Sequence, residues 1–455
     1  MGLSTIILAA GQGTRMRSDL PKVLQPLAGR PLLGHVLDCA AALAADDVCV
    51  VYGHGGEAVK TAFPDDALRW ALQAEQLGTG HALQQAMPDT PEDNRVLVLF
   101  GDVPLLTPET CQRLLDETPA EDVAVLSVDM ADPTGYGRII REGNKVSCIV
   151  EEKDAGPDEK AVCEINTGVL VGPADKLRAW LAGLGNDNAQ GEYYLTDVIA
   201  MAVNDGVAVH GVKADTWTEV MGINDKKQLA EAERALQARL VDELMRQGVG
   251  FADPARVDIR GTLKCGKDVF IDVNAVFEGD VELSDGVKIE SNNLVRESKL
   301  GAGTVVHSNC HLEGARTGND CEIGPFARLR PGADLANNVK VGNFVEIKKS
   351  TVADGSKVNH LTYIGDTEIG KMVNVGAGTI TCNYDGVNKH KTIIGDGAFI
   401  GSGVELVAPV RVGAGATVGA GATISKDVGD DQLVIERSRQ KAIPGWKKPT
   451  KKEAE

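Results

Sequence analysis

The stretch Ile323–Ile347 reads IGPFARLRPGADLANNVKVGNFVEI and places an aliphatic side chain at every sixth position. The spacing recurs in blocks through the C-terminal half. The aliphatic positions are Ile323, Leu329, Leu335, Val341, Ile347, Val352, Val358, Ile364, Ile369, Val375, Ile394, Ile400, Leu406, Val412, Val418 and Ile424. In a parallel β-helix, each short strand turns a corner and stacks its inward aliphatic residue on the coil below. The spacing therefore predicts a parallel β-helix of hexapeptide repeats.

One polar segment interrupts this repeat. Residues 381–393 read TCNYDGVNKHKTI and break the period of six. A regular solenoid gains nothing from such an excursion, whereas loops often carry function. We therefore expect residues 381–393 to form a functional loop.

The N-terminal half alternates short β-rich segments with helical stretches. The strand candidates are TIILAA (5–10), VCVVYG (48–53), VLVLFGD (96–102), DVAVLSV (122–128) and a segment around 168–172. This alternation predicts an α/β fold, with a Rossmann-like and mostly parallel sheet. Ligands of such sheets bind beyond the carboxyl ends of the strands, so the loops there are the candidates for chemistry.

An amphipathic helix is expected between the two halves. Residues 225–247 have an apolar face, with Asn224 or Asp225 as the N-cap and Gly248 as the stop. The apolar face comprises Leu229, Ala232, Leu236, Leu240 and Leu244. We predict three parts: an α/β domain over 1–224, a linking helix over 225–250, and the β-helix with a C-terminal tail over 251–455.

Composition narrows the class of protein. The 455 residues include 47 Lys and Arg against 65 Asp and Glu, a net charge of -18. This charge argues against a nucleic-acid or membrane partner, either of which would need a basic face. The nine cysteines form no C-x-x-C pair and indicate reduced thiols. With no credible signal peptide or membrane span, we expect a cytoplasmic protein.

A glycine-rich turn follows the first predicted strand. The segments LAAGQGTRM (8–16) and LPKVL (20–24) combine small residues with Arg15 and Lys22. Small residues let the backbone close on a nucleotide, and the two cations suit its phosphates. The segment fits neither a dinucleotide-binding fingerprint nor a P-loop, since the third glycine and the Gly-Lys-Ser/Thr are absent. Asp102 ends another strand, where a carboxylate would be costly to bury unless it held a cation.

Together with the loops at 76–82, 133–138 and 165–168, Glu151 and the segment GINDKKQL (222–229), these motifs resemble the sugar-1-phosphate nucleotidyltransferase family. The resemblance implies that Mg²⁺ is bound by Asp102 and Asn224, and that Arg15 and Lys22 neutralise charge during transfer. It also implies a set of residues that bind the nucleotide or the amino sugar. They are Leu8, Ala9, Ala10, Gly11, Lys22, Gln73, Gly78, Thr79, Phe100, Gly101, Asp102, Gly137, Glu151, Asn166 and Asn224. Phe100 departs from the tyrosine common in the family, so a contact through that hydroxyl is lost.

Three stretches of the predicted β-helix carry reactive side chains. RLRPGA contains Arg330, NFVEIKK contains Glu346 and Lys348, and NHLTYIGD contains His360 and Tyr363. They are spaced by roughly one coil, so we expect them to stack along one wall. His360 suits a general base, with Glu346 to orient or strengthen it, while Arg330 and Lys348 suit a sugar phosphate.

This half resembles the left-handed β-helix acetyltransferases. With the first half, the chain resembles the bifunctional bacterial family that joins N-acetylglucosamine-1-phosphate uridyltransferase to glucosamine-1-phosphate acetyltransferase. The resemblance implies synthesis of UDP-N-acetylglucosamine from glucosamine-1-phosphate, acetyl-CoA and UTP, in a homotrimer. It places at the acetyl site, besides His360 and Glu346, the residues Arg330, Lys348, Tyr363, Asn374, Ala377, Asn383, Tyr384, Ser402, Ala420 and Arg437. Arg439 departs from a common proline there.

Two alternatives stay open on the sequence. One is a sugar-1-phosphate nucleotidyltransferase whose β-helix serves only assembly or regulation. The other is an inactive scaffold whose repeats bind a partner. His360, Glu346 and the interrupting loop speak against the first, and Asp102 with Asn224 against the second.

Overall fold

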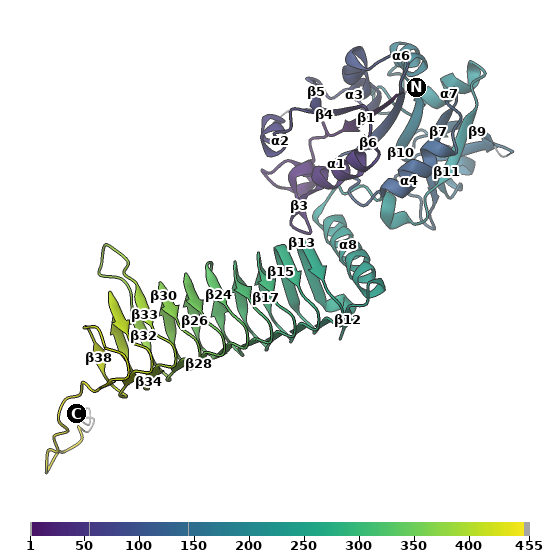
Figure 1. Cartoon of the computed structure of the whole chain (residues 1–455). Coiled ribbons are helices and arrows are strands. Elements are labelled where there is room, and N and C mark those ends of the chain that lie inside the picture. The colour runs from purple at the N-terminus through teal and green to yellow at the C-terminus, as the bar shows by residue number, and fades with distance from the viewer. Residues whose placement is uncertain (1, 54, 144, 450–455) are drawn as a thin grey trace, which may run out of the picture. The chain divides into compact units, whose positions relative to one another are not determined.

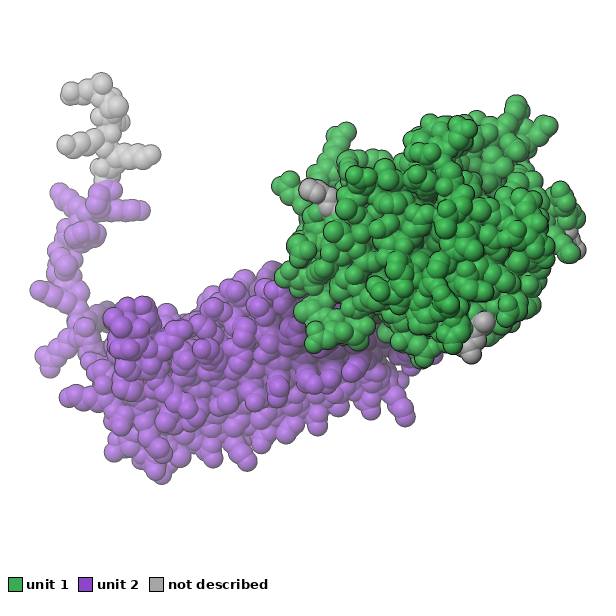
Figure 2. All heavy atoms as spheres, turned by 90° about the horizontal axis from the view of Figure 1, so that it is seen from above, with its two compact units in different colours: residues 1–239 green, residues 240–455 purple. Residues whose placement is uncertain are grey.

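The computed structural model describes residues 2–53, 55–143 and 145–449 (Figure 1). The chain divides into two compact units, residues 1–239 and 240–455, which Figure 2 colours separately. The boundary falls inside helix α8 (Lys226–Arg246). The predicted three-part division at 224 and 250 stays a prediction, and its ends at 1 and 450–455 lie outside the described residues.

Unit 1 is an α/β domain built on one mixed sheet. In the described residues the strand order is β11-β7-β10-β6-β1-β4-β5, with the β8–β9 hairpin joined through β10. Only β10 runs antiparallel to its neighbours β6 and β7 in this order. The strands are β1 (Leu3–Leu8), β4 (Asp47–Tyr52), β5 (Leu68–Leu72), β6 (Arg95–Phe100), β7 (Val123–Asp129), β8 (Arg138–Glu142), β9 (Lys145–Val150), β10 (Glu164–Pro173) and β11 (Val209–Lys213), with a small separate pair β2 (Pro26–Leu27) and β3 (Arg30–Pro31). The prediction of a mostly parallel sheet is confirmed.

Helices cover both faces of this sheet. Alternate residues of β1 point to opposite sides, so that Ile6 packs in one apolar cluster and Ile7 in another. Helices α3, α6 and α7 contribute to the first cluster, and α1, α2 and α4 to the second. The helices are α1 (Leu32–Ala42), α2 (Glu57–Ala62), α3 (Thr79–Ala86), α4 (Pro108–Asp116), α5 (Pro157–Lys160), α6 (Ala174–Ala182) and α7 (Asp197–Asn204). The carboxyl ends of β1 and β6 therefore open at one edge of a sandwiched sheet.

Helix α8 begins and ends as its residues dictate. The Asp225 carboxylate accepts a hydrogen bond from the Gln228 amide at 2.9 Å, which makes Asp225 the N-cap. At the other end Gly248 adopts a φ of +99°, a left-handed conformation that glycine tolerates best. None of the helices in the described part of the chain is long and apolar enough to cross a membrane.

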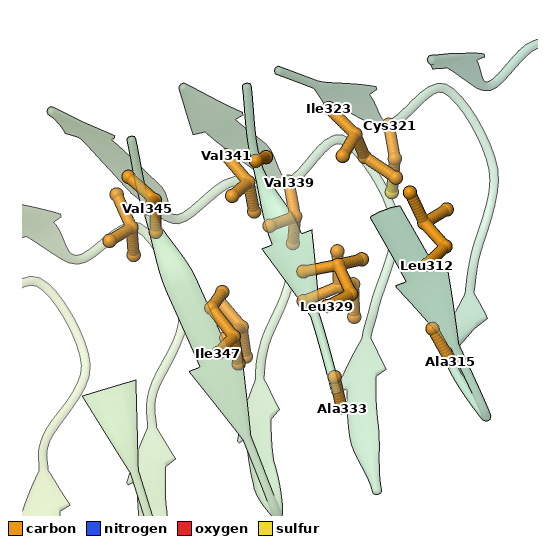
Figure 3. Close-up of a cluster of buried hydrophobic side chains, with 14 of the residues drawn as sticks. Leu312, Ala315, Cys321, Ile323, Leu329, Ala333, Val339, Val341, Val345 and Ile347 are labelled. Carbon is orange, nitrogen blue, oxygen red and sulfur yellow. The ribbon is translucent and has the colours of Figure 1, made fainter. Parts of the chain in front are cut away.

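Unit 2 is a parallel β-helix of the left-handed hexapeptide type. Every predicted aliphatic position is buried, and the interior is filled by stacked aliphatic side chains (Figure 3). Ile323 pairs with Val341 and then Val358, and Leu329 pairs with Ile347 and then Ile364. Each coil therefore repeats the inward residue directly beneath the one before it, as the sequence predicts.

Parallel strands form the faces of this β-helix in the described residues. One face comprises β12 (Gly250–Phe251), β14 (Phe270–Ile271), β16 (Lys288–Ile289), β19 (Val305–Val306), β22 (Glu322–Ile323), β25 (Lys340–Asn343), β28 (Lys357–His360), β31 (Asn374–Val375), β34 (Phe399–Ile400), β37 (Thr417–Val418) and β39 (Leu433–Val434). The remaining strands are β13 (Val257–Cys265), β15 (Ala275–Leu283), β17 (Leu294–Arg296), β18 (Lys299–Leu300), β20 (His311–Glu313), β21 (Arg316–Thr317), β23 (Arg328–Leu329), β24 (Ala333–Leu335), β26 (Glu346–Lys348), β27 (Ser350–Val352), β29 (Tyr363–Gly365), β30 (Thr367–Ile369), β32 (Ile380–Cys382), β33 (Thr392–Ile394), β35 (Glu405–Val407), β36 (Val410–Val412) and β38 (Thr423–Ile424).

The interrupting segment leaves the coil at a corner without breaking the stack. Strand pairs between neighbouring coils elsewhere mostly join residues 17 or 18 positions apart, as Lys340 pairs with Glu322 on one side and with Lys357 on the other. Across the insertion the step is 25, as in Lys371 to Asp396. Val375 still pairs with Ile400, so the register resumes after the loop. Residues 381–393 are called the inserted loop below.

Candidate active sites

Two adjoining cavities lie in unit 1, and both are built at strand ends. The first, the strand-end pocket, has a volume of about 310 Å³ and opens at the ends of β1 and β6 and the start of α3. Its lining comprises Leu8, Ala9, Ala10, Gly11, Lys22, Val23, Gln73, Gln76, Gly78, Thr79, Ala82, Phe100, Asp102 and Glu192. Most of the residues predicted to bind the nucleotide or the amino sugar are therefore brought together in one cavity.

Local backbone geometry shapes the strand-end pocket. Gly78, at the N-terminus of α3, has a φ of +113°, and a Cβ there would lie 2.6 Å from the Tyr193 carbonyl oxygen. Only glycine fits such a position without strain. The Gln73 amide donates to the Gly78 carbonyl at 3.0 Å, and the Gln76 amide donates to the Ala10 carbonyl at 3.0 Å. These bonds fix the two backbone segments that face each other across the cavity.

The second cavity, the hairpin pocket, is bordered by the β8–β9 hairpin and has a volume of about 210 Å³. It shares Thr79 and Phe100 with the strand-end pocket. Its lining is Thr79, Phe100, Val125, Gly135, Tyr136, Gly137, Ile149, Glu151, Asn166, Thr167, Gly168, Leu170, Leu195, Thr196 and Ile199. Gly137, Glu151 and Asn166, which belong to the set predicted to bind the nucleotide or the amino sugar, all line this one cavity.

Polar groups in the hairpin pocket are held in place. The Asn166 amide donates to the Gly137 carbonyl at 2.8 Å, which ties β10 to the start of the hairpin. The Thr196 hydroxyl donates to the Glu151 carboxylate at 3.0 Å. Burial raises the pKa of Glu151, because a charged carboxylate loses its hydration there. Sequence reasoning missed Thr196, whose short polar side chain in the motif YYLTD gives no distinctive signal.

Lys22, Asp102 and Asn224 meet at the edge of the strand-end pocket. The Lys22 ammonium donates to the Asp102 carboxylate and, at 3.2 Å, to the Asn224 side-chain oxygen. A carboxylate oxygen and an amide oxygen therefore converge on one cationic group. Such oxygen donors suit a hard divalent cation, which commonly takes one or two protein ligands and fills the rest of its shell with water and phosphate. The residues predicted as metal ligands thus fit the ion chemically.

The remaining predicted residues of unit 1 lie outside the cavity linings. Gly101 follows Phe100 and donates its amide to the Leu8 carbonyl at 2.9 Å, which links the two strand ends. Arg15 lies in a short 3-10 turn (Thr14–Met16) and is exposed. The pKa of Tyr136 in the hairpin pocket is raised mainly by burial, and the Arg15 charge opposes that rise. Arg15 is thus close enough to act electrostatically on this pocket.

The reactive side chains predicted to form one wall lie in two sheets of unit 2. Glu346, Lys348 and Tyr363 stand in β26 and β29 of one sheet, whereas His360 ends β28 of the other. Arg328, Glu346 and Tyr363 occupy the same position on three successive coils. Glu346 accepts a hydrogen bond from Arg330 at 2.8 Å and lies 3.7 Å from an Arg328 nitrogen. The name coil wall is used below for Arg330, Glu346, Lys348, His360 and Tyr363.

One expectation about the coil wall is corrected. The His360 Nδ1 bonds the Asn343 side-chain oxygen at 2.9 Å, and Asn343 is the strand partner of His360 on the preceding coil. Glu346, expected to orient His360, instead pairs with arginines. Two arginines attract the carboxylate more strongly than a histidine would. Asn343 was missed because a polar residue on a strand has an obvious role only once the step between coils is known.

The other predicted acetyl-site residues occupy neighbouring coils. Ala377, Ser402 and Ala420 follow the paired residues Val375, Ile400 and Val418 at one corner. Asn374 stands in β31, and the Arg437 guanidinium packs against Gly419. Arg439 is exposed in the C-terminal tail.

The inserted loop carries the remaining two predicted residues. The Asn383 amide donates to the Asp366 carboxylate at 2.6 Å, while Tyr384 is exposed. Lys389 was not predicted, yet it lowers the pKa of the Lys348 ammonium. The inserted loop therefore returns a cation to the coil wall.

Comparison with known proteins agrees with both halves. Residues 5–144 match the family of MobA-like NTP transferase domains. Residues 391–426 match the bacterial transferase hexapeptide family, described as six repeats. A nucleotidyltransferase domain followed by a hexapeptide-repeat β-helix defines a two-domain transferase.

Relatives match the chain over nearly its full length. The chain is 58% identical to "Bifunctional protein GlmU" of Aromatoleum aromaticum, covering 99% of this chain and 100% of the relative. Proteins of the same name from Azoarcus and Herminiimonas arsenicoxydans are 55% and 54% identical, covering 99% of this chain and 100% and 99% of the relatives. The chain belongs to the GlmU family of bifunctional proteins. Its two activities are uridylyl transfer to N-acetylglucosamine-1-phosphate and acetyl transfer to glucosamine-1-phosphate.

Proposed function

We propose that uridylyl transfer takes place across the strand-end pocket and the hairpin pocket. The nucleotide occupies the strand-end pocket, where the small side chains of Ala10, Gly11 and Gly78 leave the backbone accessible to it. The sugar occupies the hairpin pocket, where Glu151 and Asn166 offer hydrogen bonds. What carries this proposal is that the two cavities adjoin and share Thr79 and Phe100, so a sugar phosphate and a nucleotide would meet there.

We propose Mg²⁺ as the ion at Asp102 and Asn224. When bound, it supplies charge neutralisation for the phosphates that react. Lys22 already bonds both side chains, so it is placed to shift from them to a phosphate oxygen when the site fills. Arg15 adds a second cation at the pocket rim, and the sugar phosphate is the nucleophile toward the α-phosphate of UTP with pyrophosphate as the leaving group.

We propose that His360 is the base of the acetyl transfer. The Asn343 oxygen can only accept, so Nδ1 carries the proton and Nε2 keeps its lone pair. A neutral imidazole in this tautomer can take a proton from the sugar ammonium, and the freed amine then attacks the thioester carbonyl of acetyl-CoA. The C–N bond forms, the C–S bond breaks, and coenzyme A leaves as a thiolate that takes up the proton the nitrogen loses. Arg330 and Lys348 receive the sugar phosphate, with Tyr363, Asn374, Asn383 and Tyr384 as hydrogen-bonding groups. The corner at Ala377, Ser402 and Ala420, with Arg437, receives acetyl-CoA.

We further propose a homotrimer. Phe326, Phe344 and Leu361 stand at one corner of three successive coils with φ between 50° and 56°, a conformation that large residues rarely adopt. Each is at least half exposed, and the rings of Phe326 and Phe344 stack at 5.3 Å. An exposed apolar ridge on strained backbone beside His360 is best explained by a second copy packed against it.

We propose a cytoplasmic location and small-molecule substrates alone as partners. All nine cysteines are free thiols, with no disulfide among the described residues, which suits a reducing compartment.

The decisive experiment uses the full-length chain with glucosamine-1-phosphate, acetyl-CoA, UTP and Mg²⁺. Free thiol reports acetyl transfer and pyrophosphate reports uridylyl transfer, each followed separately. We expect both products, with pyrophosphate appearing only after thiol. A chain that released pyrophosphate from added N-acetylglucosamine-1-phosphate but never released thiol would contradict the acetyl-site proposal alone.

A further inference from the structure

Asn224, one of the two proposed ion ligands, has a side chain that is only weakly held. Its Oδ1 accepts a hydrogen bond from the Lys22 ammonium at 3.2 Å, and its Nδ2 donates to the Gly222 carbonyl over 3.4 Å, a long and therefore weak bond. Once Lys22 shifts to a phosphate, the Gly222 contact is the one side-chain hydrogen bond left to Asn224 among the described residues. An ion ligand needs closer control than this, so the position of Asn224 has to be fixed through its backbone.

The backbone of Asn224 is held from both sides. The preceding Ile223 amide donates to the Asp102 carbonyl at 2.9 Å, which ties together the two segments that carry the proposed ligands. The Asn224 amide donates to the side-chain oxygen of Gln228 at 2.7 Å. Gln228 is the third residue of α8, and its own amide donates to the N-cap Asp225. In an ordinary capping box the side chain at this position reaches back to the cap residue, whereas here it reaches one residue further, to the ligand.

The first half of α8 is a firm support for this contact. The Lys226 ammonium donates to the side-chain oxygen of Gln25 at 2.5 Å, and the Gln25 amide donates to the Lys22 carbonyl at 3.1 Å. Further along the helix, the Arg239 guanidinium donates to the Leu105 carbonyl at 2.9 Å, in the loop that follows β6. The helix is therefore hydrogen-bonded to the two segments that carry the charged groups of the ion site.

We infer that Gln228 is a positioning residue of the ion site, whose side-chain oxygen holds the Asn224 backbone so that the Asn224 and Asp102 oxygens stay converged when Lys22 moves to a phosphate. This role rests on the Mg²⁺ assignment proposed above. Gln228 is not among the residues that line either described cavity, and its oxygen is occupied by the Asn224 amide. Its effect therefore passes through Asn224.

The test measures ion binding directly, with Mn²⁺ as the probe. Mn²⁺ takes the same oxygen ligands as Mg²⁺, and the electron paramagnetic resonance signal of free Mn²⁺ reports the bound fraction. The full-length protein is titrated in the presence of UDP-N-acetylglucosamine, and Asp102→Ala gives the background from other sites. Gln228→Leu removes the acceptor at similar volume and should raise the Mn²⁺ dissociation constant about tenfold, as expected for the loss of an outer-shell partner.

Two further variants separate the hydrogen bond from charge. Gln228→Glu keeps an acceptor oxygen for the Asn224 amide and should bind Mn²⁺ at least as tightly as wild type. The double variant Lys227→Gln/Gln228→Leu has the same net charge as Gln228→Glu but no acceptor, so it should remain about fivefold weaker than wild type. Lys227 suits this control because it is exposed and its pair with Glu231, at 3.7 Å, contributes little.

Kinetics separate positioning from a loss of stability. In uridylyl transfer by Gln228→Leu, the Mg²⁺ concentration that gives half the maximal rate should rise in the same proportion, with kcat at saturating Mg²⁺ within about twofold of wild type. Acetyl transfer should be unchanged. A merely structural role would lower the unfolding midpoint of unit 1 and the amount of active protein, but would leave the Mn²⁺ dissociation constant as in wild type.

Failure of the positioning role and failure of the Mg²⁺ assignment give different results. Gln228→Ala also lacks the acceptor and should behave as Gln228→Leu does, so the outcome does not depend on how leucine packs. An unchanged Mn²⁺ dissociation constant in these two variants would overturn the positioning role, and so would wild-type affinity in the double variant. Wild-type protein that bound Mn²⁺ no better than Asp102→Ala would instead refute the Mg²⁺ assignment itself.

Discussion

The strand-end pocket and the coil wall, for which we propose phosphate-bearing substrates, are built in opposite ways. The pocket is shaped by backbone turns at the ends of β1 and β6, and two of its charged groups, Lys22 and Asp102, already pair with each other. The coil wall is assembled from side chains on successive coils, and His360 on it is exposed. A folded sheet edge supplies concavity within one unit, whereas a repeat supplies ordered side chains and leaves enclosure to loops.

The largest expected effect tests whether acetyl transfer at the coil wall depends on the His360 side chain. His360→Ala should lower acetyl transfer by about 10³-fold, because the base is lost, and leave uridylyl transfer nearly intact. Thiol release and pyrophosphate release from the same preparation measure both. Loss of the two activities together would contradict their independence.

The corresponding change in the pocket comes next. Asp102→Ala should lower uridylyl transfer by about 10²- to 10³-fold, because an oxygen donor to the ion and a partner of Lys22 are lost together. Acetyl transfer should be unchanged. Normal Mg²⁺-dependent pyrophosphate release in this variant would overturn the metal assignment.

A third change tests whether the wall needs another copy. Phe326→Asp should break the apolar ridge, give a monomer in sedimentation, and reduce acetyl transfer about tenfold while sparing uridylyl transfer. Glu322→Gln, on an exposed strand position of the same coil, is the control and should remain a trimer. A Phe326→Asp trimer with full activity would remove the ridge from the interface.

The pocket's dependence on backbone geometry is tested at Gly78. Gly78→Ala forces a Cβ against the Tyr193 carbonyl oxygen at a strongly positive φ. We expect a loss of about 1–3 kcal/mol in the stability of unit 1, seen in thermal unfolding, and a rise of a few-fold in KM for UTP. Gly135→Ala, with positive φ but open space around it, should cost less and is the matched control.

The smallest effect concerns the partly buried carboxyl of Glu151 in the hairpin pocket. Because burial raises the pKa of Glu151 above its ordinary value of 4.5, its contribution to stability is complete below that value and is lost as pH rises through the raised pKa. Wild type should therefore lose stability relative to Glu151→Gln as pH increases from 4.5 toward neutrality. Unfolding midpoints of both proteins across this range measure the difference, and parallel curves would contradict the assignment.

Much of the fold could be predicted from the sequence because it depends on regular residue spacing over short distances. The spacing of six fixes which residue of each coil points inward, and every predicted position is buried. The antiparallel direction of β10 was not predictable, since a central strand is buried on both faces whichever way it runs. The direction of β10 depends on the path of the β8–β9 hairpin that precedes it in the chain.

The candidate site could be predicted where motifs mark the ends of strands. It was harder to predict where hydrogen-bonding partners come from other coils. Ala10, Gly78 and Asp102 lie in one cavity because strands deliver their loops to the same edge. His360 pairs with Asn343 because the step between these two coils is 17 residues. Other coils are 18 residues apart, so the partner cannot be assigned from a fixed period. Glu192 and Lys389 reach their sites through loops whose return path no periodicity describes.

The 25-residue step across the inserted loop has an evolutionary consequence. Val375 pairs in register with Ile400, just as Val341 pairs with Val358. Extra residues at a corner therefore do not disturb the coils on either side. Lengthening a surface loop costs little free energy, on the order of 0.6 kcal/mol for each doubling. A repeat scaffold can therefore acquire new chemistry by local insertion, one corner at a time, while the rest of the protein keeps its architecture.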